Sequence, residues 1–347
     1  MRTKNLRVAA LLFGLVLALS VVLSGCSKNK PVTTSSLPSP YGDEKLAELK
    51  VPSTPLYVWP YVAREKGWFT ETFEQYGIKV SIVQYNSVDE VQLIGRGDMH
   101  FATRMLYPYL VYRTQGADLM GVHVSMHPRP DVASILVLKD SPIQNFDDLK
   151  GKKIASWQAS CPYMVLYEMA EQRGWVQGKD WTYINVPSGE QKNALLSREV
   201  DAVSAHLSAD IAQIYISDLA REVANPSEDS VYVNGGGVSV IFTSTKFAAD
   251  YPNITKAYIN LQKKTEQWML DNVDEATKLI ENITRTPPDV SLLTWTRRES
   301  SWKTSPLSLE TIKKETKVLQ DWLVEHGDIE ASKQVDPAVL FDPQYFK

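Results

Sequence analysis

Cysteine is scarce in this chain of 347 residues, which contains only Cys26 and Cys161. The sequence also lacks a P-loop, a nucleophile elbow and a dinucleotide-binding fingerprint. These motifs would each have pointed to an enzyme of a particular class. Their absence gives no support to catalysis, so we expect no catalytic residues and no cofactor.

A run of apolar residues long enough to cross a membrane is missing as well. The longest run, Val8 to Leu23, has about 16 residues and follows Arg2, Lys4 and Arg7, whereas a spanning helix needs roughly 20. A basic start followed by a short apolar run is typical of a secretion signal. We therefore predict that residues 1–25 are a signal peptide.

The four residues Leu23 to Cys26 resemble the lipobox of bacterial lipoproteins, in which the cysteine is lipidated. The alternative is an ordinary signal with an incidental cysteine. A lipidated Cys26 would leave Cys161 without a disulfide partner, so stability must come from the core. Residues 26–44 then form a flexible tether, and the protein is anchored by lipid to the extracytoplasmic face of the cell membrane.

Charge of one sign is not in excess. The chain is 44% apolar and 22% charged, an ordinary globular composition with room for about two domains. Removing residues 1–25 takes away three basic and no acidic residues, which leaves 34 basic against 41 acidic and a net charge of −7. An acidic chain argues against nucleic acid as a partner.

Strand and helix patterns alternate after the tether. Strand patterns at residues 48–51, 79–85 and 99–103 each precede a helical pattern, and the alternation restarts at residues 152–156, 181–186 and 201–205. Such alternation predicts parallel-rich sheets. A chain that builds one βα block, crosses to a second and crosses back predicts two lobes with a hinge. We assign residues 45–134 and 238–347 to lobe 1 and residues 135–237 to lobe 2, with the C-terminal helices packed on lobe 1.

The stretch from Lys152 to Gly174 shows how such a unit would hold a ligand. Ser160 is a good helix cap, Pro162 falls in the first helical turn, and Gly174 suits the left-handed end of the helix. The free N–H groups of this turn lie at the carboxyl end of a strand, where α/β proteins bind ligands. One capping box is predicted at Ser87 to Glu90 and a second at Ser188 to Gln191.

Several segments, in order, resemble one family. They are Tyr61–Phe69, Arg96–Asp98, Asp140–Ile143, Asp148–Ile154 and Ala194–Ala202. Together they are similar to the substrate-binding lipoproteins of nitrate/sulfonate/taurine-type ABC importers, a group related to the thiamine-pyrimidine-synthesis proteins. The resemblance runs from about Leu49 to Gly327. It implies a type II periplasmic-binding fold whose two α/β lobes close on a small molecule for delivery to a membrane permease with a separate ATPase.

The resemblance also implies a set of ligand contacts on the loops after particular strands. The residues carried over are Thr54, Trp59, Arg104, Met105, Ser156, Trp157, Ser160, Ser188 and His206. Trp59 and Trp157 would sandwich an apolar or planar group, and Arg104 would meet a sulfonate or carboxylate.

Each candidate has a plainer interpretation. The tryptophans would then only pack lobe faces, Arg104 would be a solvated residue on the first turn of a helix, and Ser160 and Ser188 would only cap helices. His206 would be a polar residue at a strand end. His123 and His127 lack the geometry of a metal pair, and Cys161 at a tight helix start is no clear nucleophile, so we expect no metal site.

The sequence therefore predicts a monomeric solute-binding protein of an ABC importer that captures a small organic anion, sulfonate- or carboxylate-like and possibly aromatic. A thiamine-pyrimidine or another heterocyclic vitamin precursor is the alternative ligand. An enzyme on the same fold, or a sensor that feeds no transporter, are further alternatives.

Overall fold

The computed structural model describes residues 38–54, 57–85, 89–126, 133–158, 160–227, 229–299 and 307–346. The predicted signal, Cys26, nearly all of the tether, Ser87 and His127 lie outside these residues. The described residues belong to one unit that starts at Leu37. None of its helices is both long enough and apolar enough to cross a membrane.

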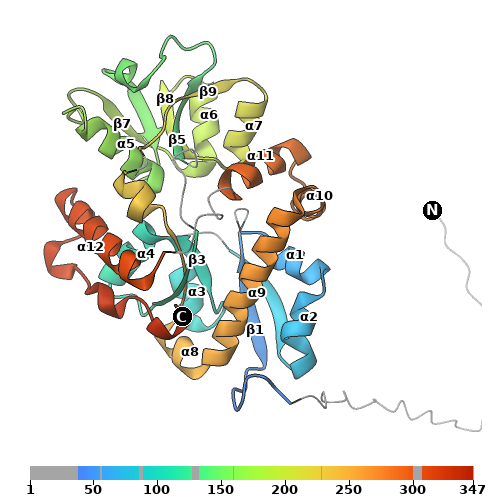
Figure 1. Ribbon diagram of the computed structural model, residues 1–347. Helices are drawn as coiled ribbons and strands as arrows, with labels where there is room; N and C mark the ends of the chain where they lie inside the picture. Colours follow the sequence, from blue (N-terminus) through green and yellow to red (C-terminus); the bar gives the residue numbers. More distant parts are fainter. Residues whose placement is uncertain are drawn as a thin grey trace, which may run out of the picture. The chain divides into compact units, whose positions relative to one another are not determined.

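The strands fall into three hydrogen-bonded sheets (Figure 1). The first pairs β1 with β2 in parallel, and the second has the order β3-β10-β4 with antiparallel pairs. The third has the order β7-β6-β8-β5-β9. The strand bounds are β1 Glu48–Ser53, β2 Lys79–Gln84, β3 Ala102–Met105, β4 Met120–Met126, β5 Ala133–Leu138, β6 Lys153–Ser156, β7 Thr182–Asn185, β8 Ala202–His206, β9 Ala220–Ala224 and β10 Ser239–Thr243.

Parallel pairing holds for β6 with β7 and β8, as the alternation predicted. The antiparallel pairs involve β5 and β10, which lie where the chain passes between the three-stranded sheet and the five-stranded sheet. The five-stranded sheet is therefore mixed, whereas the described pairs of the three-stranded sheet are all antiparallel. β9 was not predicted.

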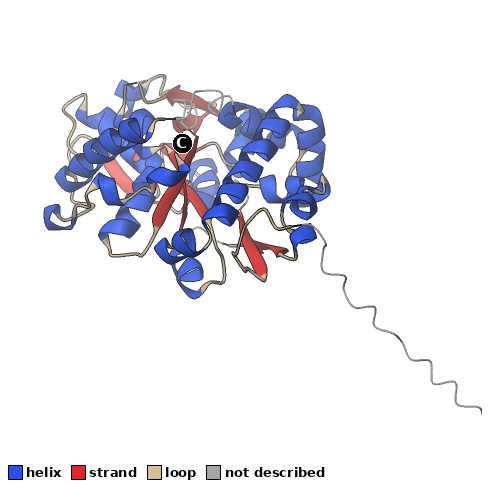
Figure 2. Cartoon of the chain, turned by 60° about the horizontal axis from the view of Figure 1, so that its bottom comes forward, coloured by secondary structure: helices blue, strands red, loops and turns tan. Residues whose placement is uncertain are grey.

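Helices surround these sheets, as Figures 1 and 2 show. The α-helices are α1 Trp59–Glu65, α2 Trp68–Thr72, α3 Glu90–Arg96, α4 Leu106–Thr114, α5 Cys161–Glu171, α6 Gln191–Leu196, α7 Ala209–Ile216, α8 Thr245–Asp250, α9 Pro252–Asp271, α10 Val273–Thr284, α11 Pro288–Glu299 and α12 Leu309–Glu325. The single-turn helices are η1 Glu74–Tyr76, η3 Phe146–Leu149, η4 Ser188–Glu190, η5 Tyr232–Gly236, η6 Ala331–Lys333, η7 Pro337–Val339 and η8 Pro343–Tyr345.

Local signals set several helix ends as expected. Ser160 and Ser308 cap α5 and α12 by accepting a backbone N–H, and Gly97, Gly174 and Gly327 adopt left-handed conformations after helices. Ser188 is different, because η4 contains it and its side chain makes no cap hydrogen bond. The capping box predicted at Ser188 is therefore wrong: the single turn Ser188–Glu190 comes first, and α6 begins only at Gln191.

The C-terminal segment packs on the three-stranded sheet β3-β10-β4. Gly121 of β4 donates its N–H to the Leu340 oxygen at 2.9 Å, and Asp342 donates to the Gly121 oxygen at 3.0 Å. The buried Tyr109 of α4 donates its hydroxyl to the same Leu340 oxygen at 2.6 Å. Phe341, 1% exposed, joins the core there. The C-terminal residues thus close the sheet that contains β3.

Candidate ligand-binding site

A small pocket lies at the carboxyl ends of β1 and β2. It is lined by Pro52, Ser53, Thr54, Tyr57, Trp59, Tyr85 and Thr103. These residues offer hydroxyl groups and aromatic rings and carry no formal charge. The carboxyl ends of parallel strands are the usual ligand edge of α/β proteins, which makes this pocket the candidate site.

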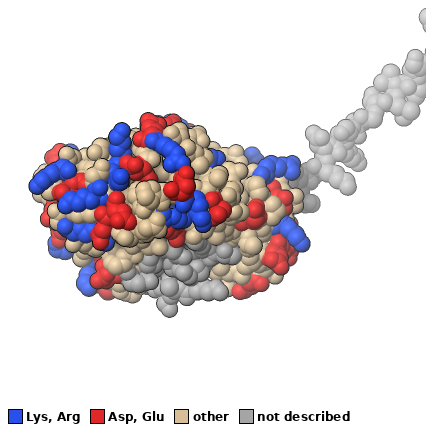
Figure 3. Space-filling model, turned by 90° about the horizontal axis from the view of Figure 1, so that it is seen from above, with Lys and Arg blue, Asp and Glu red and all other residues tan. Residues whose placement is uncertain are grey.

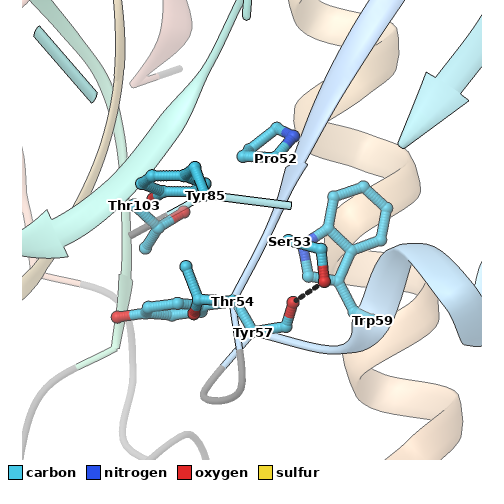
Figure 4. Close-up of a pocket in the computed structure, with 7 residues that line it drawn as sticks. All are labelled: Pro52, Ser53, Thr54, Tyr57, Trp59, Tyr85 and Thr103. Carbon is cyan, nitrogen blue, oxygen red and sulfur yellow. Dashed lines mark hydrogen bonds between the residues drawn. The ribbon is translucent and has the colours of Figure 1, made fainter. Parts of the chain in front are cut away.

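Contacts of the residues at the end of β1 shape the pocket. Thr54 and Tyr57 form an isolated bridge, and the Ser53 hydroxyl donates to the Tyr57 carbonyl oxygen at 3.2 Å (Figure 4). Figure 4 shows the rings of Tyr57 and Tyr85 on one side of the β1 ribbon and the Trp59 indole on the other. Hydroxyl groups and rings therefore lie together at the strand end.

Trp59 contributes to the lining mainly through packing. Its side chain is only 3% exposed, and its ring centroid lies 6.1 Å from Phe69 and 5.5 Å from Tyr258 in an edge contact. The ring therefore belongs to the hydrophobic core that also contains Phe69 and Tyr258. No contact between Trp59 and Trp157 is found in the described residues, so the predicted sandwich stays a prediction.

Arg104 lies within β3 rather than on the first turn of a helix, which corrects the plainer interpretation. Antiparallel pairing with Val240 of β10 holds residue 104 in the strand, and α4 begins only at Leu106. The guanidinium Nε lies 3.0 Å from Oε1 of Glu90, whose side chain is fully buried. The side chain of Arg104 itself is 19% exposed. The cation is therefore paired rather than solvated.

The pKa values of this cluster follow from burial and pairing. Burial raises the pKa of Glu90, while Arg104 and a hydrogen bond from the Tyr112 hydroxyl at 2.8 Å act in the opposite direction. Burial acts to lower the pKa of Arg104, but Glu90 and three nearby tyrosines outweigh it and raise that pKa. Two of those tyrosines, Tyr57 and Tyr85, line the pocket. Arg104 and Glu90 are thus close enough to act on groups of the pocket.

Met105, at the end of β3, faces a residue that the sequence did not single out. Ser239 of β10 pairs with Met105 across the strands and is 1% exposed. Its hydroxyl donates to the Met105 sulfur at 3.5 Å and lies 3.4 Å from the Tyr57 hydroxyl. Ser239 lies two residues after the triple glycine of residues 235–237. This triple glycine interrupts the alternation of strand and helix patterns, and it was the only signal in the sequence near Ser239.

The five-stranded sheet gathers a second set of polar residues. Because β6, β7 and β8 are parallel, their last residues, Ser156, Asn185 and His206, lie along one edge. Ser156 is fully buried, and its hydroxyl has no hydrogen-bond partner among the described residues. Asn185, which was not predicted, accepts from the backbone N–H of Gln158 at 3.0 Å. His206 is partly buried, with its ring 6.4 Å from Tyr232.

The turn between β6 and α5 carries three more candidates. Trp157 is partly exposed, and its carbonyl oxygen accepts from the Ser160 hydroxyl at 2.5 Å. Ser160 also accepts from Tyr163 N–H at 3.4 Å as the cap of α5. Ser188 is exposed in η4 and makes no cap bond. Ser156, Trp157 and Ser160 therefore lie together, at the same sheet edge as His206.

Cys161, the first residue of α5, relates the residues around Arg104 to the polar residues at the end of the five-stranded sheet. Its thiol donates to the Gly236 oxygen at 3.3 Å, and burial raises its pKa to about 12. The charge of Arg104 acts on the same thiol in the opposite direction. Arg104 of β3 therefore lies near the first residue of α5, which brings the predicted cation and the predicted helix N-terminus into one region.

Histidines do not form a metal centre in the described part of the chain, where no group of three or more His, Cys, Asp or Glu side chains is placed to hold an ion. His123 is buried, and burial lowers its pKa to about 4. His127 lies outside the described residues.

On the face drawn in Figure 3, basic and acidic side chains alternate over the described residues without a patch of one sign. Such a mixed surface matches the balanced composition of the chain.

Known proteins with similar sequences and folds were found in three comparisons. A protein of Bacillus subtilis (strain 168) whose name describes it as an aliphatic sulfonates-binding protein is 27% identical over 279 residues, which cover 78% of each chain. The crystal structure of the periplasmic aliphatic sulphonate binding protein SsuA from Escherichia coli aligns with a TM-score of 0.73 at 17% identity, covering 86% of this chain and 92% of that one.

The alkanesulfonate-binding protein SsuA from Xanthomonas axonopodis pv. citri, solved with MOPS bound, aligns with a TM-score of 0.70 at 19% identity and covers 86% of this chain and 98% of that one. These likenesses confirm the α/β fold of the two-lobed type II periplasmic-binding class. The sequence model of the NMT1/THI5-like family matches residues 55–276, which is more than half of the chain. The family resemblance read from the sequence is thereby confirmed: this chain belongs to the NMT1/THI5-like family of substrate-binding proteins.

Proposed function

We propose that this protein is the solute-binding component of an ABC importer and captures a small organic anion with a sulfonate or carboxylate headgroup. Family membership and the sulfonate-binding names of its relatives support this proposal. Cys26 after the apolar run supports a lipid anchor, which would hold a monomer at the extracytoplasmic face of the cell membrane. A permease and its ATPase would then receive the ligand.

One observation carries the choice of an anion. The guanidinium of Arg104 lies beside a pocket whose lining has hydroxyl groups but no charge of its own. A guanidinium is a strong partner for sulfonate and carboxylate oxygens, and hydroxyl groups supply further donors. The hydroxyl of the buried Ser156, which has no partner in the part of the chain that the structure describes, and the N-terminus of α5 offer donors from the five-stranded sheet.

A heterocyclic vitamin precursor is the second candidate, and the aromatic lining favours it. Tyr57, Tyr85 and Trp59 surround the pocket and present ring surface to a planar ligand. Such a ligand would depend on these rings more than on Arg104.

Cys161 is the residue of this region that an enzymatic role on the same fold would most readily use as a nucleophile. Cys161 is buried, and its pKa of about 12 keeps the thiol protonated at neutral pH. The thiolate is the reactive form of cysteine, so Cys161 is poorly suited to attack a substrate.

A thermal-shift screen of the full chain tests the proposal. The panel holds straight-chain alkanesulfonates, the matched carboxylates and the matched alcohols as uncharged controls, together with aminopyrimidines. We expect the sulfonates or carboxylates to raise the melting temperature and the alcohols to leave it unchanged. Stabilisation by the pyrimidines alone would favour the second candidate, and turnover of a bound ligand would contradict both.

A further inference from the structure

Glu90 belongs to the Arg104 cluster, and the proposed function gives it no role. It is the first residue of α3 and is fully buried. Its Oε1 receives the Tyr112 hydroxyl and lies 3.0 Å from Arg104 Nε, while its buried Oε2 has no hydrogen-bond partner among the described residues. A carboxylate in such a place needs an explanation, because burying an ion pair adds little net stability.

The position of Glu90 ties it to the pocket. Thr103 and Tyr85 line the pocket, and they come one residue before Arg104 and five residues before Glu90. The charges of both Glu90 and Arg104 act on the Tyr85 hydroxyl, whose pKa is raised chiefly by burial. The ion pair therefore lies near Tyr85, a residue of the pocket lining.

The charges of Arg104 and Glu90 set the electrostatics of the pocket. Its described lining is uncharged, so the nearby charges that act on it are the positive Arg104 and the negative Glu90. A ligand anion is attracted by the first and repelled by the second, and both energies scale with the ligand's charge. A doubly charged headgroup is repelled by Glu90 twice as strongly as a singly charged one, and it loses more hydration on entering a partly buried site.

We propose that Glu90 is a specificity-determining residue, which pairs with Arg104 so that the pocket accepts singly charged oxyanion headgroups and rejects doubly charged ones. Sulfonates and sulfate monoesters belong to the accepted class, and phosphate monoesters to the rejected class. This inference rests on the proposed function, since it assumes that an anion occupies the pocket. Arg104 then supplies the attraction, and Glu90 limits it.

Butyl sulfate and butyl phosphate form a matched pair of probes. They have the same chain and nearly the same shape, but at pH 7.5 the first carries one negative charge and the second close to two. The measured quantity is the ratio of their dissociation constants for the full chain, by calorimetry at fixed ionic strength. The wild-type protein should bind the sulfate more tightly.

Glu90→Gln removes the negative charge and keeps the side-chain size. We expect it to strengthen butyl sulfate binding about tenfold and butyl phosphate binding about a hundredfold, since the gain in free energy scales with ligand charge. Asp89→Asn is the control, because it removes a negative charge from the adjacent, exposed residue. This control should change the ratio less than about twofold, because exposed charges are screened.

Substitutions of Arg104 give an independent check if the Glu90→Gln variant does not fold. Arg104→Gln leaves Glu90 alone and should weaken the phosphate more than the sulfate. The double variant Glu90→Gln with Arg104→Gln removes both charges and should return the ratio to near its wild-type value.

An unchanged ratio in a folded Glu90→Gln variant would overturn the role of Glu90 while the anion site stood. If neither probe bound the wild-type chain, both this inference and the proposed anion ligand would fail.

Discussion

Arg104 of β3 and Glu90 of α3 form an ion pair, with Nε 3.0 Å from Oε1, beside a pocket that has no charge in its described lining. The pair explains how a guanidinium that is only 19% exposed is kept beside a pocket at the carboxyl ends of β1 and β2. It also gives the site a positive and a negative charge at once. The preference of the site for an anion then depends on the balance between these two residues.

The affinity for a singly charged anion should rise as the pH falls. Burial raises the pKa of Glu90, against the charge of Arg104 and the Tyr112 hydrogen bond; Asp89 and Tyr85 are the other titratable groups acting there. Protonation of Glu90 removes a repulsive charge, and the raised pKa moves this step above the usual range of a carboxylate. Butyl sulfate does not titrate in this range, so its dissociation constant between pH 8 and pH 5 reports the protein.

The Glu90→Gln variant is the control for this pH dependence. It should bind butyl sulfate with nearly constant affinity over the same range. An equal slope in the variant would assign the effect to another group.

Trp157 and Trp59 should differ in what their loss affects. Trp59 is 3% exposed and packs against Phe69 and Tyr258, so Trp59→Ala should lower the free energy of unfolding by about 3–5 kcal/mol. Trp157 is partly exposed beside the N-terminus of α5. Trp157→Ala should cost less than about 1 kcal/mol of stability but weaken ligand binding about tenfold. Urea unfolding and calorimetry measure the two quantities, and full affinity in Trp157→Ala would remove this residue from the site.

Gly121 should not tolerate a side chain. A Cβ there would lie 2.6 Å from Cδ1 of the buried Phe341 and 3.1 Å from the Leu340 oxygen. Gly121→Ala should therefore lower the free energy of unfolding by about 1–3 kcal/mol. Gly189→Ala is the matched control, because no atom lies within 4 Å of its Cβ position. Urea unfolding of the two variants compares them, and equal stabilities would show that the C-terminal segment moves freely off β4.

Two histidines, the buried His123 and the partly buried His100, should make the fold sensitive to mild acid. Burial, as the main cause, lowers the pKa of His100 and of His123 to about 4, whereas histidine in an unfolded chain titrates near 6.5. The unfolded state therefore binds protons first, and stability is lost as the pH falls from about 6.5 to about 4. Each histidine contributes at most about 3 kcal/mol to this loss.

The His123→Gln variant isolates that contribution. The difference in unfolding free energy between pH 7 and pH 5 should be smaller in the variant than in the wild type. The same difference in both proteins would mean that His123 takes up a proton without unfolding.

The local signals of the sequence were sufficient where structure depends on neighbours along the chain. Ser160 and Pro162 at the start of α5 and Gly174 after its end followed from capping and backbone conformation alone. The βα alternation likewise placed β1, β2, β6, β7 and β8 correctly, because each strand carries its own apolar pattern.

Long-range pairing was beyond the reach of those signals. Arg104 belongs to a strand because β10, more than 130 residues later, pairs with β3. Glu90, Asn185 and Ser239 acquire their places at the site from contacts between distant segments, which their local sequence does not specify. Ser188 shows the opposite error, since a good local capping pattern formed a single 3₁₀ turn instead.

The central claim, that the pocket beside Arg104 binds an organic anion, is tested most directly by calorimetric titration of the full chain with butanesulfonate. We predict one ligand per chain, a tenfold or greater loss of affinity in Arg104→Gln, and no loss in Arg96→Gln, whose exposed side chain pairs only with Asp98 among the described residues. Equal affinities in the wild type and Arg104→Gln would contradict the claim.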